Sequence, residues 1–243
     1  MKTFLFELCA ESFEAARVAE ARGADRIELC SNLAIGGVTP DFALMSATVR
    51  ALTIPVHVLI RPRGGDFVYT AEEFASMERQ VEQAKAAGAG GVAVGVLLAD
   101  GRVDLERSRA LVELARPLSV TFHRAFDETP DLCEALEAVI ATGADCLLTS
   151  GGAADVLSGA ESIGRLVKQA GRRLHMMAGG GLRLSNLVQV VRRSGVRYLH
   201  GSLSSREGRL SAGSVEALEE DVREAIRLLN EEFAPLQSAS LAG

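Results

Sequence analysis

The sequence predicts an α/β protein folded as a single (β/α)8 TIM barrel. The chain has 243 residues, which is the usual size of one such barrel. Short apolar segments alternate with amphipathic stretches of helical period, and short connections join them, an order typical of parallel strands with helical crossovers. Eight such units favour a closed barrel over an open doubly wound sheet, which has roughly five or six strands.

The predicted strands follow one another along the chain, and a helical pattern comes after each: Phe4–Cys9, Asp25–Cys30, Val56–Arg61, Gly91–Val96, Leu118–His123, Asp145–Ser150, Leu174–Ala178 and Arg197–Gly201. The last helix is expected over about Ser214–Glu232, where apolar residues recur at helical spacing. No linker or break in composition interrupts the series. Residues 1–243 are therefore expected to form one domain, with a short disordered tail from about residue 236.

Residues at the expected helix starts support the same alternation. Thr39-Pro40 and Thr129-Pro130 each place a capping oxygen before a proline at the first helical position. Thr70 and Glu73 are spaced as a capping box. These signals predict where three of the helices begin.

Side-chain alternation along the strands predicts a charged barrel interior. In this fold the outer face of each strand packs on helices and is apolar, and successive side chains point to opposite faces. Turning the apolar residues outward leaves a polar set inside, near the upper end: Glu7, Glu28, Arg61, His123 and His200. One interpretation is a satisfied structural lattice of ion pairs. Because burying charge is costly and apolar residues often serve stability as well, a functional site at the strand ends is the favoured interpretation.

The loops after the third and fifth predicted strands carry candidate catalytic groups. Arg61 and Arg63 flank a proline beside a Gly-Gly turn, where two guanidiniums can hold a carboxylate or phosphate. Asp66 in the same loop is a candidate base or a partner for arginine. The alternative is a rigid turn pinned by its own Arg–Asp pair. After the fifth strand, His123 is a candidate acid or base, with Asp127 as its orienting partner.

Glycine-rich loops follow the seventh and eighth predicted strands. Barrels often bind phosphate between these two loops, through backbone N–H groups that only glycine lets a ligand approach. The candidate anion-binding residues there, beside Arg63, are Gly179, Gly180, Gly181, Gly201 and Ser202. The alternative interpretation is a set of tight turns.

The cysteines indicate a different chemistry. Cys9 and Cys30 end two neighbouring strands within matching Glu-Leu-Cys triplets, and adjacent strands lie roughly 4.8 Å apart. If the register pairs the triplets, the two sulfurs can share one soft metal ion. Thiolates without carboxylate competition select Cu(I) or Zn, and a linear pair suits Cu(I), whereas Zn takes a fuller tetrahedral set. The alternative is that both are small buried hydrophobic residues.

The remaining cysteines and histidines are interpreted as structural. Cys133 falls on a predicted helix, and Cys146 lies near the start of the sixth strand. His57 and His175 lie near strand starts, at the bottom face of the barrel, and are expected to be ordinary packed histidines.

Composition excludes several function classes. The formal net charge is −6, from 26 Lys+Arg and 32 Asp+Glu, and no basic run with interleaved aromatic residues occurs, so nucleic acid is not expected as a partner. The start Met1-Lys2-Thr3-Phe4 leads to acidic Glu7 without an apolar h-region, so no signal peptide is expected. No apolar run approaches the ~18 residues of a membrane span. The four cysteines are therefore expected to be reduced thiols in a soluble cytosolic protein.

From about Phe4 to Ser202, these motifs together resemble the CutC copper-homeostasis family. The segments that carry the resemblance are Phe6-Glu7-Leu8-Cys9, Gly23-Ala24-Asp25-Arg26-Ile27-Glu28-Leu29-Cys30, Gly36-Gly37-Val38-Thr39-Pro40, Ile60-Arg61-Pro62-Arg63-Gly64-Gly65-Asp66-Phe67, Val120-Thr121-Phe122-His123-Arg124-Ala125-Phe126-Asp127, Leu148-Thr149-Ser150-Gly151-Gly152 and Ala178-Gly179-Gly180-Gly181. The resemblance implies a barrel fold, a cytoplasmic location, homo-oligomers and a role in copper tolerance through Cu(I) binding. The family's proposed copper ligands match Cys9 and Cys30, and no organic cofactor is implied.

A second hypothesis keeps the polar mouth as an enzyme site. It is a barrel lyase, isomerase or hydrolase acting on a small phosphorylated or carboxylated metabolite. Arg61 and Arg63 would clamp the anion. Glu7 or Glu28 would serve as the base, and His123 as the acid. A third interpretation is a regulatory module that senses such a metabolite without turnover.

Overall fold

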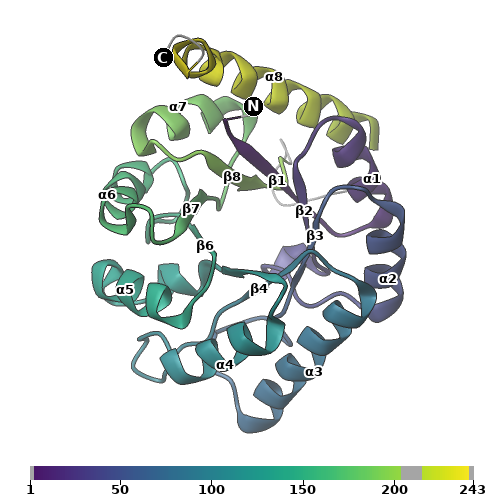
Figure 1. Cartoon of the computed structure of the whole chain (residues 1–243), viewed down its shortest axis with the longest axis vertical. Coiled ribbons are helices and arrows are strands. Elements are labelled where there is room, and N and C mark those ends of the chain that lie inside the picture. Colours follow the sequence, from purple (N-terminus) through teal and green to yellow (C-terminus); the bar gives the residue numbers. More distant parts are fainter. Residues whose placement is uncertain (1–2, 204–214, 241–243) are drawn as a thin grey trace.

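Eight parallel strands close into a barrel, and helices surround it, as the sequence predicts (Figure 1). The structure is a computed structural model that describes residues 3–203 and 215–240. The strands are β1 (Leu5–Ala10), β2 (Arg26–Leu29), β3 (Val56–Leu59), β4 (Gly91–Val94), β5 (Ser119–Phe122), β6 (Cys146–Thr149), β7 (His175–Ala178) and β8 (Tyr198–Gly201). Each overlaps its predicted segment and differs from it by one or two residues at an end.

The helices lie outside the barrel, each after the strand that precedes it in the sequence. They are α1 (Phe13–Ala21), α2 (Phe42–Ala51), α3 (Ala71–Ala87), α4 (Leu105–Ala115), α5 (Leu132–Thr142), α6 (Ala160–Ala170), α7 (Leu184–Ser194) and α8 (Val215–Ser240), with short 3-10 turns η1 (Leu33–Ile35) and η2 (Arg124–Glu128). The capping box of Thr70 and Glu73 at the start of α3 is confirmed.

Two other predicted helix starts are wrong by two residues. Helices α2 and α5 begin after Asp41 and Asp131, whose carboxylates accept the first backbone N–H groups of their helices. A charged oxygen next to the positive end of a helix is favoured over the threonine hydroxyl two residues earlier. The hydroxyl of Thr39 instead accepts the backbone N–H of Arg61 and so links α2's entry loop to the end of β3.

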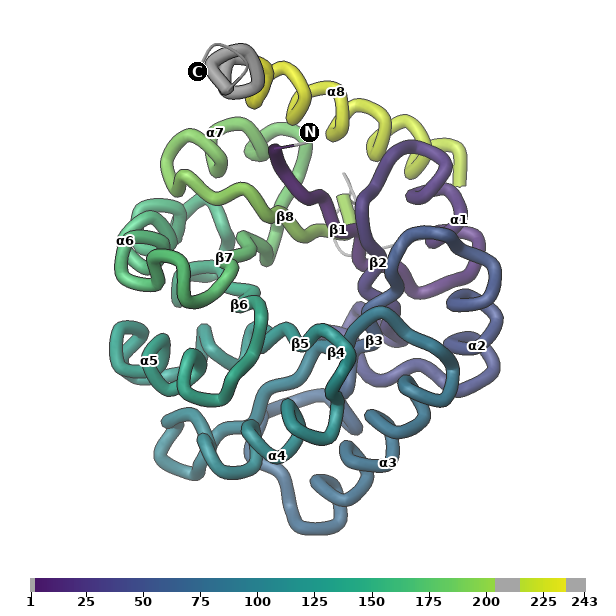
Figure 2. The backbone as a smooth tube through the Cα atoms, viewed as in Figure 1, coloured from purple at the N-terminus to yellow at the C-terminus, as the bar shows by residue number. Residues whose placement is uncertain are grey.

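Helix α8 closes the outer ring between α1 and α7 (Figure 2). Phe233 of α8 stacks on Phe4 at the start of the chain, with 5.5 Å between ring centroids. The helix runs beyond the predicted end at Glu232, so the backbone of the expected tail is helical as far as Ser240, and residues 241–243 lie outside the described residues. Within the described ranges, none of the helices combines the length and the apolar character that a bilayer crossing requires.

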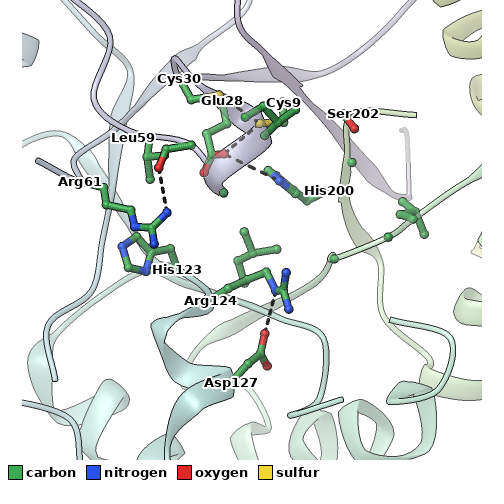
Figure 3. A pocket seen from close by; sticks show the side chains of 18 of the residues that line it. Cys9, Glu28, Cys30, Leu59, Arg61, His123, Arg124, Asp127, His200 and Ser202 are labelled. Carbon is green, nitrogen blue, oxygen red and sulfur yellow. Dashed lines mark hydrogen bonds and ion pairs between the residues drawn. The ribbon is translucent and has the colours of Figure 1, made fainter. Parts of the chain in front are cut away.

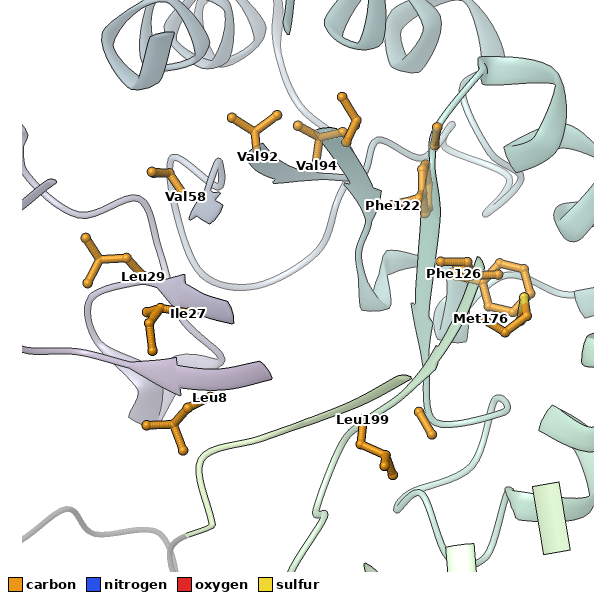
Figure 4. Close-up of a cluster of buried hydrophobic side chains, with 14 of the residues drawn as sticks. Leu8, Ile27, Leu29, Val58, Val92, Val94, Phe122, Phe126, Met176 and Leu199 are labelled. Atoms are coloured by element: carbon orange, nitrogen blue, oxygen red, sulfur yellow. The ribbon is translucent and has the colours of Figure 1, made fainter. Parts of the chain in front are cut away.

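The hydrophobic core lies between the barrel and its helices. Alternate strand residues point outward into it, and Figure 4 shows several of them: Leu8, Ile27, Leu29, Val58, Val92, Val94, Phe122 and Leu199. The residues between them point inward. Near the upper end, Cys9, Cys30 and Leu59 form a small interior cluster, and deeper in the barrel Cys146 packs with Met177. The outer face of the barrel is therefore apolar, whereas its interior combines these small apolar clusters with buried polar groups such as Glu7, Arg26 and His57.

Candidate functional site

A pocket of about 440 Å³ opens at the carboxyl ends of the strands. Its lining comes from both halves of the chain, because the ends of all parallel strands in a closed barrel meet at one mouth. Figure 3 shows Cys9, Glu28 and Cys30 gathered at one side, with Arg124 and Asp127 at the other. Arg61, His123 and His200 also line the pocket.

The sulfur atoms of Cys9 and Cys30 lie 3.6 Å apart, both buried. The register does not pair the two Glu-Leu-Cys triplets, which was the condition set for shared sulfurs, since Cys9 pairs with Glu28, and Glu7 pairs with Arg26. Neighbouring strands of a closed barrel are staggered, so the two matching triplets are offset by two residues and their inward side chains meet diagonally. The sulfurs are therefore neighbours in spite of the offset.

A carboxylate and an imidazole complete this cluster. Cys9 Sγ lies 3.4 Å from Glu28 Oε2, and His200 Nε2 lies 3.7 Å from the same oxygen. Ligand atoms of Cys9, Glu28 and His200 all lie within 4.8 Å of one another. A carboxylate therefore lies beside the thiols, so the site is not one of sulfur ligands alone. The inward alternation placed Glu28 and His200 in the barrel, but only the register puts them beside the sulfurs.

Burial and the neighbouring groups together set the protonation of this cluster. The neighbouring Cys30 thiol, together with burial, raises the pKa of Cys9 well above its ordinary value. Burial raises the pKa of Glu28, and the charge of Glu7 adds to the rise. Burial alone would lower the pKa of His200, but the carboxylates of Glu28 and Glu7 outweigh it and raise the pKa.

Glu7 lies beneath the pocket and is not among its lining residues, which places this predicted base away from the mouth. It accepts hydrogen bonds from Arg26 Nε and, at 2.7 Å, pairs with His200 Nδ1. Burial would raise its pKa, but Arg26 and His200 outweigh burial, so the pKa of Glu7 lies below its usual range. Glu7 is therefore a charged, fully engaged group that orients His200.

Arg61 reaches the pocket but is occupied by the loops around it. Its guanidinium donates to the carbonyl oxygens of Ile35, Gly37 and Gly65, at 3.2, 2.9 and 2.7 Å. It also lies 4.7 Å from the ring centroid of Phe67. These contacts tie the loop after β2 to the loop after β3. The main role of the Arg61 side chain is therefore to hold these two loops together at the edge of the pocket.

Arg63 and Asp66 are not among the pocket-lining residues. Arg63 Nε donates to Glu73 at 2.6 Å, and Arg63 Nη2 donates to Asp66 at 2.9 Å. Because Glu73 at the start of α3 captures the guanidinium, the loop is a turn pinned by its own ion pairs, as the alternative interpretation held. A clamp made by Arg61 and Arg63 on one anion is therefore absent from the described structure.

His123 lines the pocket, but Asp127 does not orient it. His123 Nδ1 accepts the backbone N–H of Ala125 at 3.2 Å. Asp127 instead binds Arg124 Nε at 2.9 Å and the N–H and hydroxyl of Ser150 in the loop after β6. Burial, with the nearby charge of Arg61, lowers the pKa of His123 to about 3. The imidazole is therefore neutral near neutral pH and is a poor general acid.

Of the predicted anion-binding glycines, Gly180, Gly181 and Gly201 line the pocket with Ser202. Gly179 does not line the pocket. A side chain at this position would lie 2.6 Å from Leu148 and 3.0 Å from His200, which pack against it. Its role is to make room for those packed groups. The loop after β8 continues into residues 204–214, which lie outside the described residues.

Sequence reasoning missed three arginines. Arg26 was given no role, and it is the buried counter-charge of Glu7. Arg124 and Arg183 both line the pocket, and Figure 3 shows Arg124 on the side opposite the thiols. Arg124 directly follows His123 and so carried a signal in the sequence, whereas Arg183 carried none.

The cysteines and histidines that were interpreted as structural differ in burial. Cys146 is buried deep inside, where burial raises the pKa of its thiol to about 12, and Cys133 is exposed on α5. His57 is buried, and burial lowers its pKa to about 4. His175 is exposed at the start of β7 but stacks on Tyr198, with 4.9 Å between the ring centroids.

The fold and this pocket define a TIM-barrel protein with paired thiols at the carboxyl ends of its first two strands. A model of the CutC family matches residues 4–205, nearly the range over which the resemblance was expected. The chain belongs to the CutC family.

Individual relatives agree with this assignment. A CutC family protein of Caulobacter vibrioides is 46% identical, over 82% of this chain and 80% of the relative. The human copper homeostasis protein cutC homolog is 44% identical, over 83% of this chain and 74% of its own length. The solved structure of CutC from Streptococcus agalactiae is 32% identical, with a TM-score of 0.77 over 82% of this chain and 98% of that one. Thiamine phosphate pyrophosphorylase from Pyrococcus furiosus, 17% identical with a TM-score of 0.61 over 95% and 97% of the two chains, shows the shared fold alone.

Proposed function

We propose that this protein binds one Cu(I) ion in the cytoplasm through the sulfur atoms of Cys9 and Cys30. The observation that carries the proposal is their 3.6 Å separation inside the pocket at the strand ends. Thiolates are soft ligands and select Cu(I) among the common cellular metals, with Zn as the main competitor. The copper homeostasis name of the human relative supports the choice of copper.

The distance between the sulfurs favours a bent arrangement over a linear one. Two metal–sulfur bonds of roughly 2.3 Å meeting at a tetrahedral angle span about 3.8 Å between the sulfur atoms. A linear pair spans about 4.6 Å with the same bonds, so a linear site requires the two strands' ends to open. A bent pair leaves room for another ligand. Glu28 Oε2 lies 3.4 Å from Cys9 Sγ, and His200, whose imidazole suits copper better than a carboxylate does, has its Nε2 within 4.8 Å of both atoms.

Glu7 supports His200 in that role. Metal-binding histidines commonly donate their second ring N–H to a carboxylate, which fixes the tautomer and the ring orientation. The contact of His200 Nδ1 with Glu7 has this form and leaves Nε2 toward Glu28 and Cys9. His200 is therefore added to the cysteines as a proposed ligand.

The geometry does not favour the enzyme hypothesis in the form that the sequence predicted. Glu7 lies beneath the pocket, and Arg63 is bound to Glu73 and Asp66. His123 is neutral. Assembly into a homo-oligomer stays a prediction of the family resemblance.

Anaerobic titration with Cu(I) against a competing chelator tests the proposal. The parent protein should take up one tightly held equivalent, and Cys9→Ser or Cys30→Ser should abolish the tight phase. Cys133→Ser is the matched control, because this cysteine is exposed on α5, and it should bind like the parent. Parent-like copper binding in the Cys9→Ser/Cys30→Ser protein, or Zn displacing Cu(I) at equal concentration, contradicts the proposal.

A further inference from the structure

We infer that Leu33 is a gate over the paired thiols of Cys9 and Cys30, which admits small molecules to the sulfur atoms and excludes bulky ones. Both cysteines line the pocket, yet Cys9 is only 5% exposed and Cys30 is 0% exposed. Their pocket side must therefore be covered by a neighbouring group. The inference concerns access to the thiols and holds whichever ion or molecule they bind.

The side chain of Leu33 is placed to provide this cover. It lines the pocket, is partly buried, and packs against the small apolar cluster that contains both cysteines, Leu59 and Ala93. Leu33 belongs to the turn η1 in the loop after β2, and the end of this loop also lies beside Cys30, because a Cβ atom at Gly37 would be 3.7 Å from Cys30 Sγ. The loop and its leucine therefore shield the sulfur atoms from the open part of the pocket.

The loop of residues 31–38 is closed at its base by its own hydrogen bonds. Ser31 and Val38 form an antiparallel bridge, in which each backbone N–H donates to the carbonyl oxygen of the other residue, at 2.9 and 2.7 Å. At the tip, Ala34 and Ile35 are exposed. The loop is therefore a compact unit that presents Leu33 to the pocket and its other tip residues to the outside.

Two side chains from neighbouring loops hold this unit against the pocket. The carboxylate of Glu11, after β1, accepts the backbone N–H of Leu33 itself. Arg61, after β3, donates to two carbonyl oxygens of the loop, at 3.2 and 2.9 Å. A Cβ atom at Gly36 would lie 2.9 Å from Arg61 Nη1, and this residue has φ +88, so glycine allows the guanidinium to approach the loop. Arg61 therefore holds the gate closed.

The way in which the gate opens makes it selective for size. A small ion or a methyl-sized reagent needs only a change in the Leu33 rotamer, whereas an aromatic reagent needs the whole loop to move away. Side-chain rotamers change faster than loops move. Opening the loop also breaks its hydrogen bonds to Glu11 and Arg61, so the open state is a minor, locally unfolded one.

For a Cu(I) ion bound as proposed above, the gate acts on exchange. A bulky chelator reaches the ion only after the loop opens, so the leucine slows the transfer of copper out of the protein. The equilibrium affinity is set by the ligand atoms and does not depend on the leucine. This consequence rests on the proposed function, whereas the following test uses protein without metal and is independent of it.

Thiol labelling of the full chain tests the inference. Two uncharged reagents are compared, methyl methanethiolsulfonate as the small one and dithiodipyridine as the bulky aromatic one, and mass spectrometry of peptides gives the rate at each cysteine. Both reagents react with the thiolate, so the ratio of their rates at one cysteine is independent of its pKa. Cys133 is exposed and gives the ratio for an open thiol, whereas the deeply buried Cys146 reports unfolding.

In the parent, the small reagent should label Cys9 and Cys30. The ratio of small-reagent to bulky-reagent rates at these two thiols should exceed the ratio at Cys133 at least about tenfold, because the bulky reagent requires the loop to open. Leu33→Ala should bring the ratio to within about threefold of the Cys133 value, because the cover over the sulfurs is then removed.

Arg61→Gln is the second variant, and it keeps the test valid if labelling of Cys146 shows that Leu33→Ala has unfolded. It removes the two hydrogen bonds from the guanidinium to the loop but leaves the leucine in place. The loop should then open more often, and the ratio at the paired thiols should fall toward the Cys133 value.

Ile35→Ala is the matched control, because Ile35 lies in the same turn, is 55% exposed and is not among the pocket-lining residues. It should keep the ratio of the parent. The inference is overturned if the paired thiols of the parent show the Cys133 ratio or resist the small reagent as well. It is also overturned if the folded Leu33→Ala or Arg61→Gln protein keeps the parent ratio, or if Ile35→Ala changes the ratio as much as Leu33→Ala does.

Discussion

His200 Nδ1 lies 2.7 Å from Glu7 Oε1, on neighbouring strands that join the two ends of the chain in the barrel wall. The same carboxylate accepts a hydrogen bond from Arg26 on the other side, so one buried anion connects a buried cation to the imidazole of the candidate site. Glu7 is only 1% exposed, and Arg26 is 7% exposed. The contact couples the stability of the barrel centre to the orientation of His200.

Glu7→Gln should therefore damage both properties. Removing the charge leaves Arg26 buried without its partner, a change that costs about 3–5 kcal/mol of unfolding free energy in comparable pairs. If His200 is a ligand, the affinity for Cu(I) should fall roughly 10- to 100-fold, because the carboxylate no longer orients the ring. Urea unfolding and Cu(I) competition measure the two effects.

Glu137→Gln provides the control for this variant. Glu137 pairs with Arg173 on the surface, where both side chains are 48% exposed, so its loss should leave the urea midpoint nearly unchanged. If Glu7→Gln is no more destabilising than Glu137→Gln, the buried Glu7–Arg26 pair does not stabilise the barrel centre.

Gly91→Ala should destabilise the barrel through His57. A methyl group at this position of β4 would lie 2.4 Å from His57 Nε2, inside the packed interior. Overpacking of this kind costs about 1–3 kcal/mol, measurable as a lower unfolding midpoint. In a His57→Ala background the ring is gone, so the same substitution should cost much less, and equal costs in both backgrounds would refute the contact.

The eightfold succession of strand and helix segments was enough to predict the closed barrel and the strand positions, and side-chain alternation along the strands predicted the inward direction of Glu7, Glu28 and His200. It could not predict height in the barrel, because that depends on the stagger between strands. Glu7 was therefore placed at the mouth although it lies beneath it, and Glu28 was not expected beside Cys9.

Hydrogen-bond partners in loops were harder still to predict. Arg63 is held by Glu73, ten residues away, and Asp127 by the loop after β6. In both cases the sequence spacing allowed another partner that was equally reasonable. The partner was decided by tertiary structure: the start of α3 brings Glu73 to Arg63, and the loop after β6 brings the N–H group of Ser150 to Asp127.

Stability should fall as the pH falls below about 6.5, and His123 should contribute to the fall. Burial lowers the pKa of folded His123 to about 3, so between these values the unfolded chain binds a proton that the folded chain does not. The unfolding free energy then drops by up to about 1.4 kcal/mol per pH unit for this residue. Urea unfolding of His123→Gln from about pH 6 to about pH 4.5 should show a shallower decline than the parent. An unchanged slope would show that His123 is not buried in its neutral form.

X-ray absorption at the copper edge of the protein loaded with one equivalent of Cu(I) tests the central claim most directly. The account predicts sulfur scatterers from both Cys9 and Cys30, together with one lighter ligand that disappears in His200→Ala. Cys133→Ser should give the parent spectrum. A copper shell without sulfur, or a sulfur shell that remains intact in Cys9→Ser/Cys30→Ser protein, would contradict it.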